Sequence, residues 1–186
     1  WATDASYFRV VGWGYYYLIS VLDDYSRMIL GSRVQTSMSS ADIIEVVQDA
    51  VEFTGQPTAP VEPDPTLLSD NGLGFLSRAL DEFLRARFMK HIFASLFHPQ
   101  TNGKLERYHR TAKANVNVFV HHSPEELVAA MGSFVRYYNY ERYHEALGNI
   151  TPADMYHGRQ DAILATRQEV KQKSLAERRL ANLRTA

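Results

Sequence analysis

The sequence has no cysteine, almost no net charge and no long hydrophobic run; the first and the last exclude classes of function, whereas the near-neutral charge neither supports nor excludes a DNA partner. Without cysteine there is no disulfide, no thiolate nucleophile and no cysteine-ligated zinc, which fits a reducing compartment. Twenty basic residues against 21 acidic ones give a formal net charge of −1, so any nucleic-acid surface must come from local clustering. No apolar run approaches the roughly 20 residues that span a bilayer, and no signal peptide is visible.

What is present describes an ordinary globular chain. Its 186 residues are 45% hydrophobic and 22% charged, which predicts one domain with a real core, plus extensions. The chain begins with Trp1 rather than methionine, so we expect it to be a piece of a longer polypeptide.

The first third of the chain is strand-like. Aromatic and β-branched residues dominate three stretches, at 1–10, 15–22 and 27–34. The polar "DDYS" at 23–26 predicts a tight connection between antiparallel strands. Ser39 and Asp42 then have the spacing of a capping box at the start of an amphipathic helix over 39–53.

The middle of the chain alternates strand and helix patterns. The proline-rich stretch 54–66 predicts a surface connection, and "TLLSDNG" at 66–72 predicts a short buried strand that ends in a turn. A helical pattern over 77–87 and a strand pattern over 88–95 follow. Strand, helix and strand in this order favour parallel pairing with a right-handed crossover.

The last part of the chain is helical. One helix is expected over 104–120 and another over 123–144, which begins with Ser123 as its cap. Residues 158–186 carry four more Lys and Arg than Asp and Glu, and they predict a basic helical extension of a core at 1–157. The whole order predicts an α/β fold of the ribonuclease-H-like kind, a five-stranded mixed sheet with helices on both faces.

Three carboxylates could converge in such a sheet. Asp4 lies in the first strand, Asp70 ends the fourth, and Glu106 lies one turn into a helix. Phosphoryl transfer with two magnesium ions about 3.5–4 Å apart needs hard oxygen ligands of this kind. Residues 71–105, 35 in all, separate the second acid from the third, a spacing that is weak evidence without structural context.

Four stretches supply that context: "TDAS" at 3–6, "LLSDNG" at 67–72, "HPQTNGKLERYHR" at 98–110 and "YYNYERYHEALGNITPADMY" at 137–156. In this order they resemble the integrase catalytic core (rve-type, with a DDE triad) of bacterial IS3-type insertion-sequence transposases, which is related to retroviral integrases. The likeness runs from residue 1 to about 159. The sequence departs from the family pattern at Ala5 and Ser6, where a threonine or other larger residue is common.

The resemblance implies a DNA recombinase. Asp4, Asp70 and Glu106 would be the catalytic residues and the ligands of two Mg²⁺ ions, with Mn²⁺ as an alternative metal, and Asp4 would bridge both ions. The enzyme would cleave a transposon end and join the liberated 3′-hydroxyl to target DNA without a covalent enzyme intermediate. The resemblance also implies a homodimer or higher oligomer on DNA, a bacterial cytoplasmic location at the nucleoid, and an upstream helix-turn-helix module that strengthens DNA binding.

Some acids and histidines have simpler explanations. A lone acid in a strand, turn or helix is most often solvated, so each member of the triad depends on its partners. Asp23 and Asp24 are alternative candidates for metal-binding carboxylates, but their residue types favour the interpretation that they are polar residues of a hairpin turn. His98 is a possible metal ligand, but we prefer the interpretation that it is a loop residue whose side chain hydrogen-bonds to the backbone.

Cations surround Glu106 on its helix. They are candidates for binding the phosphates beside the scissile bond, and the alternative is a solvated helix face with mixed charges. The candidate DNA contacts are Lys104, Arg107, His109, Arg110 and Lys113. Asn102 and Gly103 supply the helix start, and the aromatic stretch 136–144 is interpreted as core packing rather than as a platform for bases.

Two other functions stay open on the sequence alone. One is a catalytically idle DNA-binding or assembly fragment of a transposase, in which the triad is present but unused. The other is a ribonuclease-H-like nuclease that shares the fold. Metal-dependent nicking and a choice between DNA and RNA–DNA hybrid substrates separate these possibilities.

Overall fold

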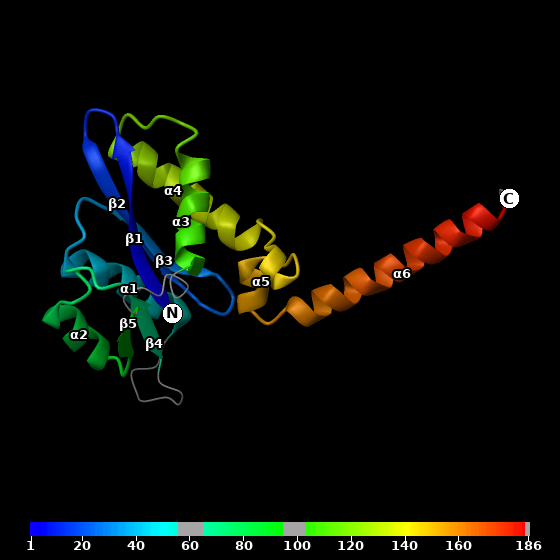
Figure 1. Ribbon diagram of the computed structural model, residues 1–186, viewed down its shortest axis with the longest axis horizontal. Coiled ribbons are helices and arrows are strands. Elements are labelled where there is room, and N and C mark those ends of the chain that lie inside the picture. The colour runs from blue at the N-terminus through cyan, green and yellow to red at the C-terminus, as the bar shows by residue number, and fades with distance from the viewer. Residues whose placement is uncertain (56–64, 95–102, 185–186) are drawn as a thin grey trace.

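The computed structural model describes residues 1–55, 65–94 and 103–184, and it has a mixed five-stranded sheet at its centre (Figure 1). The strand order in the sheet is β3-β2-β1-β4-β5. The strands are β1 (Ala2–Val10), β2 (Gly14–Leu22), β3 (Ile29–Gln35), β4 (Thr66–Ser69) and β5 (Lys90–Phe93). The helices are α1 (Ser40–Thr54), α2 (Arg78–Arg85), α3 (Gly103–Val116), α4 (Pro124–Tyr140), η2 (Glu145–Leu147), α5 (Pro152–Tyr156) and α6 (Gln160–Arg184).

The pairing of the strands confirms the predicted mixed sheet. β1 and β2 form an antiparallel hairpin, β2 and β3 are antiparallel, and β4 lies parallel to both β1 and β5. The hairpin turns through Gly12 and Gly14, whose φ angles of +81° and +99° suit glycine. Asp23 makes the predicted β2–β3 turn, where its carboxylate accepts hydrogen bonds from the Ser26 backbone N–H at 2.8 Å and hydroxyl at 2.6 Å.

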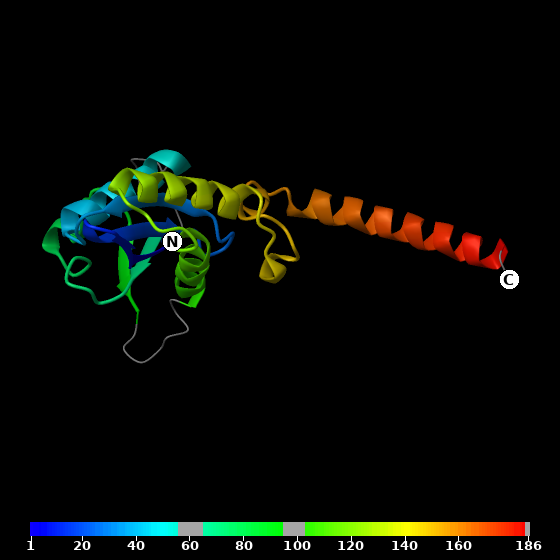
Figure 2. The ribbon, with the colours of Figure 1, turned by 90° about the horizontal axis from the view of Figure 1, so that it is seen from above.

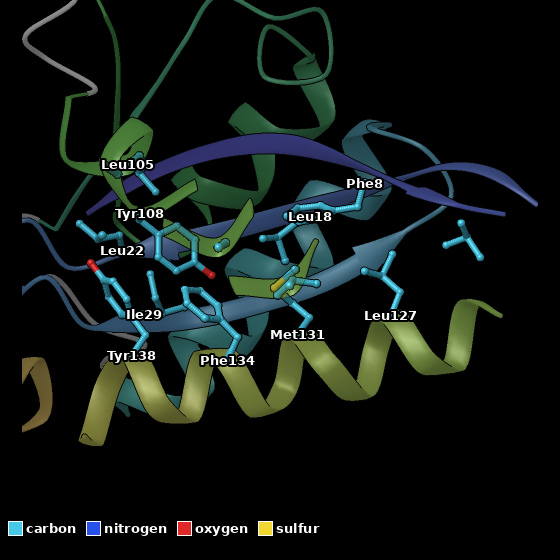
Figure 3. Packing of buried hydrophobic residues seen from close by; sticks show 14 residues of the cluster. Phe8, Leu18, Leu22, Ile29, Leu105, Tyr108, Leu127, Met131, Phe134 and Tyr138 are labelled. Carbon is cyan, nitrogen blue, oxygen red and sulfur yellow. The ribbon is translucent and has the colours of Figure 1, made fainter. Parts of the chain in front are cut away.

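Each face of the sheet has its own hydrophobic core, because successive strand residues point to opposite faces. Leu18 and Leu22 of β2 pack with α3 and α4 (Figure 3), whereas Ile19 and Val21 pack with α1 and α2 on the other side. Tyr108 of α3 lies completely buried in the first core. Burial raises its pKa to about 12, so the phenol is protonated at neutral pH.

Two helix starts are as predicted and two helix ends are not. Ser39 forms the capping box of α1 with Asp42, and the Ser123 hydroxyl accepts the Glu126 N–H at the start of α4. The predicted end of α3 at residue 120 was wrong, because the chain leaves the helix after Val116 and the His121 carbonyl accepts the Val11 N–H of the hairpin at 2.9 Å. α4 likewise ends at Tyr140 rather than at 144.

The chain beyond α4 turns back on itself instead of continuing as a helix. His144 forms an isolated antiparallel bridge with Ile150, and its ring stands edge-on to the Tyr138 ring, with centroids 4.8 Å apart. Tyr138 is itself buried against Tyr108 and Phe134. The predicted core-packing role of the aromatic stretch is therefore confirmed for Tyr138, while Tyr140 and Tyr143 are exposed.

His144 is expected to make the fold sensitive to acid. Burial, together with the charges of Arg142 and Arg27, lowers its pKa from 6.5 to about 4, so the folded state favours the neutral ring. The unfolded chain takes up the proton near pH 6.5, so stability is full above that pH and falls as the pH drops toward 4. When the free energy of unfolding in urea is measured at about pH 7 and at about pH 5, it should fall less between the two pH values in His144→Gln than in the wild type.

The matched control for this prediction is His157→Gln, since His157 is exposed. That variant should keep the wild-type loss of stability between the two pH values. An unchanged loss in His144→Gln would contradict the assignment of the acid sensitivity to His144.

α6 projects from the body of the molecule (Figures 1 and 2). Near its start, the Arg167 guanidinium donates to the Asn149 carbonyl at 2.8 Å and lies 5.3 Å from the Tyr143 ring. The predicted helix is confirmed, whereas the division into units at 1–157 and 158–186 stays a prediction. None of the described helices combines the length and apolarity needed to cross a membrane.

Candidate active site

The first predicted acid, Asp4, lies in β1, and the second, Asp70, directly follows β4, the parallel neighbour of β1. Ala2 of β1 pairs with Leu68 of β4, and the Leu68 N–H donates to the Trp1 carbonyl at 2.8 Å. Counting two residues further along each strand from this pair leads to Asp4 in β1 and to Asp70 just beyond the end of β4, and adjacent strands are about 4.8 Å apart. Ala2 packs on the α3–α4 side of the sheet, so Asp4, two residues further along β1, belongs to the same face.

α3 crosses this face and brings His109 to Asp4. The His109 Nδ1 atom lies 3.5 Å from Asp4 Oδ2, and the His109 side chain is only 8% exposed. Tyr108 fixes the helix at this point, because its hydroxyl oxygen accepts a hydrogen bond of 3.4 Å from the Ser20 hydroxyl. Asp4 is directly opposite Ser20 in the β1–β2 hairpin, so the same short length of sheet holds both contacts.

His109 is therefore placed differently from the sequence expectation, which put it among the DNA contacts. It lies on the buried face of α3 with Leu105, Tyr108 and Ala112, and it faces a carboxylate rather than solvent. Its Nε2 atom is buried and has no hydrogen-bond partner among the residues that the structure describes. We expect His109 to position Asp4, not to bind phosphate.

Glu106 lies on α3 one helical turn before His109, and its side chain is exposed. Within the described parts of the chain, no group of three or more His, Asp or Glu side chains is close enough together to hold a metal ion. The structure thus brings His109 to Asp4, places Asp70 directly after the strand that pairs with β1, and leaves Glu106 exposed on α3. His98 and Asn102, two residues that the sequence singled out, lie outside the described residues.

The turn after β4 fixes the position of Asp70. Its Oδ1 atom accepts the Gly72 N–H at 2.9 Å, which confirms the turn predicted for "SDNG". A Cβ atom at Gly72 would lie 3.0 Å from that same oxygen, so glycine leaves the carboxylate in place. The Asn71 side chain donates to the Ala94 carbonyl at 3.1 Å and fastens the turn to the end of β5.

His91 is linked to the backbone of Asp70 through the Ser69 hydroxyl. The Ser69 hydroxyl donates to the Asp70 carbonyl at 2.9 Å and lies 2.9 Å from His91 Nε2. With the hydroxyl proton used in this way, the imidazole donates its Nε2 proton to the serine oxygen. Burial lowers the pKa of His91, which favours the neutral ring that this arrangement uses.

The carboxylates keep oxygens that suit a hard cation. Asp70 Oδ2 and both Glu106 oxygens accept no hydrogen bond from the described residues, and Asp4 Oδ2 has only the long contact with His109. Carboxylate oxygens are the ligands that Mg²⁺ and Mn²⁺ prefer. The donor set of Asp4, Asp70 and Glu106 therefore fits a magnesium site by its chemistry.

The remaining candidate DNA contacts, Lys104, Arg107, Arg110 and Lys113, differ in their surroundings. Lys104 is engaged within the protein, because its ammonium donates to the Asp24 carboxylate at 2.5 Å and to the Asp24 carbonyl at 2.9 Å. Arg107 and Arg110 are exposed on α3. The Lys113 ammonium lies 4.4 Å from the centre of the Tyr7 ring.

Sequence reasoning missed the partners of several of these groups. The His109–Asp4 contact joins residues more than 100 positions apart, and only the spacing of three from Glu106 hinted at it. Nothing local signals the pairing of Ser69 with His91 or of Lys104 with Asp24. Such pairs depend on which strands and helices become neighbours.

Two known protein families match the chain. A family described as "Integrase core domain" matches residues 1–99, and a second family with the same description matches residues 88–152. The Gag-Pro-Pol polyprotein of Squirrel monkey retrovirus is 28% identical over 117 residues, 63% of this chain and 6% of that protein. The 39.2 kDa protein of insertion element IS476 from Xanthomonas euvesicatoria is 27% identical over 138 residues, 73% of this chain and 37% of that protein.

Solved structures share the fold. The HTLV-2 integrase catalytic core domain in complex with magnesium, in its dimeric form, aligns with a TM-score of 0.66 at 20% identity and covers 84% of this chain and 94% of that one. The catalytic core domain of BIV integrase aligns with a TM-score of 0.61 at 15% identity, covering 88% and 97%. The chain thus covers most of these two solved domains but well under half the length of the two curated relatives.

Proposed function

This chain belongs to the integrase core family, and from that premise we propose that it is the catalytic core of a transposase that cuts and joins DNA strands. The observation that carries the proposal is the pairing of β1, which contains Asp4, with β4, which leads into Asp70, together with a helix that brings His109 to Asp4 and carries Glu106. Hard oxygen ligands on two strands and a facing helix suit metal-assisted phosphoryl transfer.

Asp4, Asp70 and Glu106 would hold two Mg²⁺ ions, or Mn²⁺ in their place. Bound Mg²⁺ supplies Lewis acidity at the entering and leaving oxygens of a phosphodiester. The protein keeps its own carboxylates in position for this work. Asp4 Oδ1 accepts the Ala5 N–H at 2.8 Å while Oδ2 faces His109, and the turn at Gly72 holds Asp70.

The exposed face of α3 would hold the DNA backbone. Arg107 and Arg110 are exposed near Glu106, where guanidinium groups can pair with phosphate oxygens in a bidentate manner. Lys113 lies further along the same helix. Lys104 would contribute only if DNA competes with Asp24 for its ammonium.

The partners of the chain would be the two ends of a mobile DNA element and a target DNA. Joining two ends in one complex requires at least a homodimer or higher oligomer. Dimeric and trimeric forms are described for the HTLV-2 core, which supports the same expectation here. A bacterial insertion element would place this activity at the nucleoid in the cytoplasm.

The test uses a branched DNA that mimics the product of strand joining. Phosphoryl transfer is reversible, so a core that joins strands should also resolve the branch, a reaction that needs the active site but little recognition of the ends. Release of the labelled strand should require Mg²⁺ or Mn²⁺ and stop in EDTA. DNA binding without any strand release would contradict catalysis, and faster cleavage of an RNA–DNA hybrid would favour a ribonuclease.

A further inference from the structure

A groove of about 410 Å³ lies at the far end of β1, between the β1–β2 hairpin and the segment that joins α3 to α4. Both segments lie at the top of Figure 1, away from α2 and β5. The Val11 N–H donates to the His121 carbonyl at 2.9 Å and joins the two segments, and both residues line the groove. Neither the proposed metal ligands nor the comparisons account for this feature.

Aromatic rings line the groove although they are open to solvent. Tyr7, Tyr15 and Phe119 are 59%, 58% and 73% exposed, and all three belong to the lining. Tyr7 and Tyr15 meet edge to face with ring centroids 5.7 Å apart. They belong to two hydrogen-bonded strands, so their backbones are held in place. A ligand that stacks on these rings therefore loses little binding free energy to ordering the protein.

The charges in the groove are all of one sign. Arg9 and Lys113 are among its lining residues, and no lining residue is acidic. Neither cation forms an ion pair with the described residues, and the Lys113 ammonium is already over the Tyr7 ring. Exposed rings interleaved with unpaired cations match a ligand that carries flat apolar bases and anionic phosphates, which is single-stranded nucleic acid.

The groove is also connected to the proposed active site. Lys113 follows Glu106 by seven residues on α3, two helical turns or about 10 Å along the axis. A strand held at Glu106 can therefore continue along the helix to the groove. On the basis of the proposed function, we propose that the groove binds unpaired nucleotides of the DNA strand beside the reaction site, with bases stacked on Tyr7 and Tyr15 and phosphates held by Arg9 and Lys113.

The test measures binding in the absence of metal. A fluorescent single-stranded oligothymidine is titrated with the chain in EDTA at low salt, and anisotropy reports the dissociation constant. Tyr7→Leu should weaken binding roughly tenfold, since stacking contributes about 1–3 kcal/mol per base, while Tyr7→Phe should keep most of the affinity. Tyr25→Leu is the matched control, because Tyr25 is 66% exposed but lies in the β2–β3 turn.

Arg9→Gln gives an independent readout should a leucine variant fail to fold, and it should weaken binding and flatten the salt dependence. Equal affinity of Tyr7→Leu, Tyr15→Leu and the wild type would overturn the proposal, and so would tighter binding of a matched duplex than of the single strand. The outcome is separable from catalysis. Ring-dependent binding without resolution of branched DNA would contradict the proposed function alone, and resolution with ring-independent binding would contradict this inference alone.

Discussion

Asp70→Asn is expected to slow the resolution of branched DNA by at least about a thousandfold, because a metal ligand contributes several kcal/mol of transition-state stabilisation. The fold should survive the change. The asparagine Oδ1 atom can still accept the Gly72 N–H that now reaches Asp70 Oδ1 at 2.9 Å, so the turn after β4 is kept. The measurements are the single-turnover rate of strand release in Mg²⁺ and the free energy of unfolding in urea.

Asp161→Asn is the matched control for this experiment. Asp161 is exposed at the start of α6, and its replacement removes the same charge from the chain without touching β1, β4 or α3. Its rate should equal that of the wild type. Asp70→Asn should change the free energy of unfolding by no more than about 0.5 kcal/mol. A rate within threefold of the wild type would remove Asp70 from the proposed metal ligands.

Asn139→Leu is expected to destabilise the fold by about 2–4 kcal/mol, the largest effect on stability foreseen here. Asn139 lies on α4 and is only 4% exposed. Its side chain accepts a hydrogen bond from the Ile29 N–H and donates one to the Ile29 carbonyl, both at 2.9 Å. It thereby satisfies the two backbone groups of a β3 residue that a neighbouring strand would otherwise pair with. Leucine has a similar volume but would leave both backbone groups buried without a partner.

Urea unfolding measures this effect, with Asn115→Leu as the control. Asn115 is exposed on α3, and among the described residues its side chain bonds to the Thr111 carbonyl one turn earlier. Asn115→Leu should therefore change the free energy of unfolding by no more than about 0.5 kcal/mol. Asn139→Asp gives a second comparison, since a carboxylate keeps the acceptor for Ile29 but loses the donor. A loss below about 1 kcal/mol in Asn139→Leu would show that the two hydrogen bonds do not fasten α4 to β3.

Local chemistry made much of the fold predictable. Ser39 and Ser123 marked the starts of α1 and α4, because a serine side chain meets the free N–H groups of a first helical turn whatever lies beyond it. Asp23 marked a turn for a similar reason. The helix ends at Val116 and Tyr140 were missed, since contacts with the hairpin and with Ile150 stop the helices there.

The sequence by itself determined the alternation of strands and helices, the family resemblance and the identity of three acids, because these depend on side-chain periodicity and on the order of short motifs. Only the tertiary structure decided that His109 faces Asp4, that Lys104 is paired with Asp24, and that Lys113 joins Tyr7 at a groove. The physical reason is the geometry of α3. A rotation of about 100° per residue separates neighbouring side chains on the helix, so packing on the sheet decides which side chain turns inward and which faces solvent.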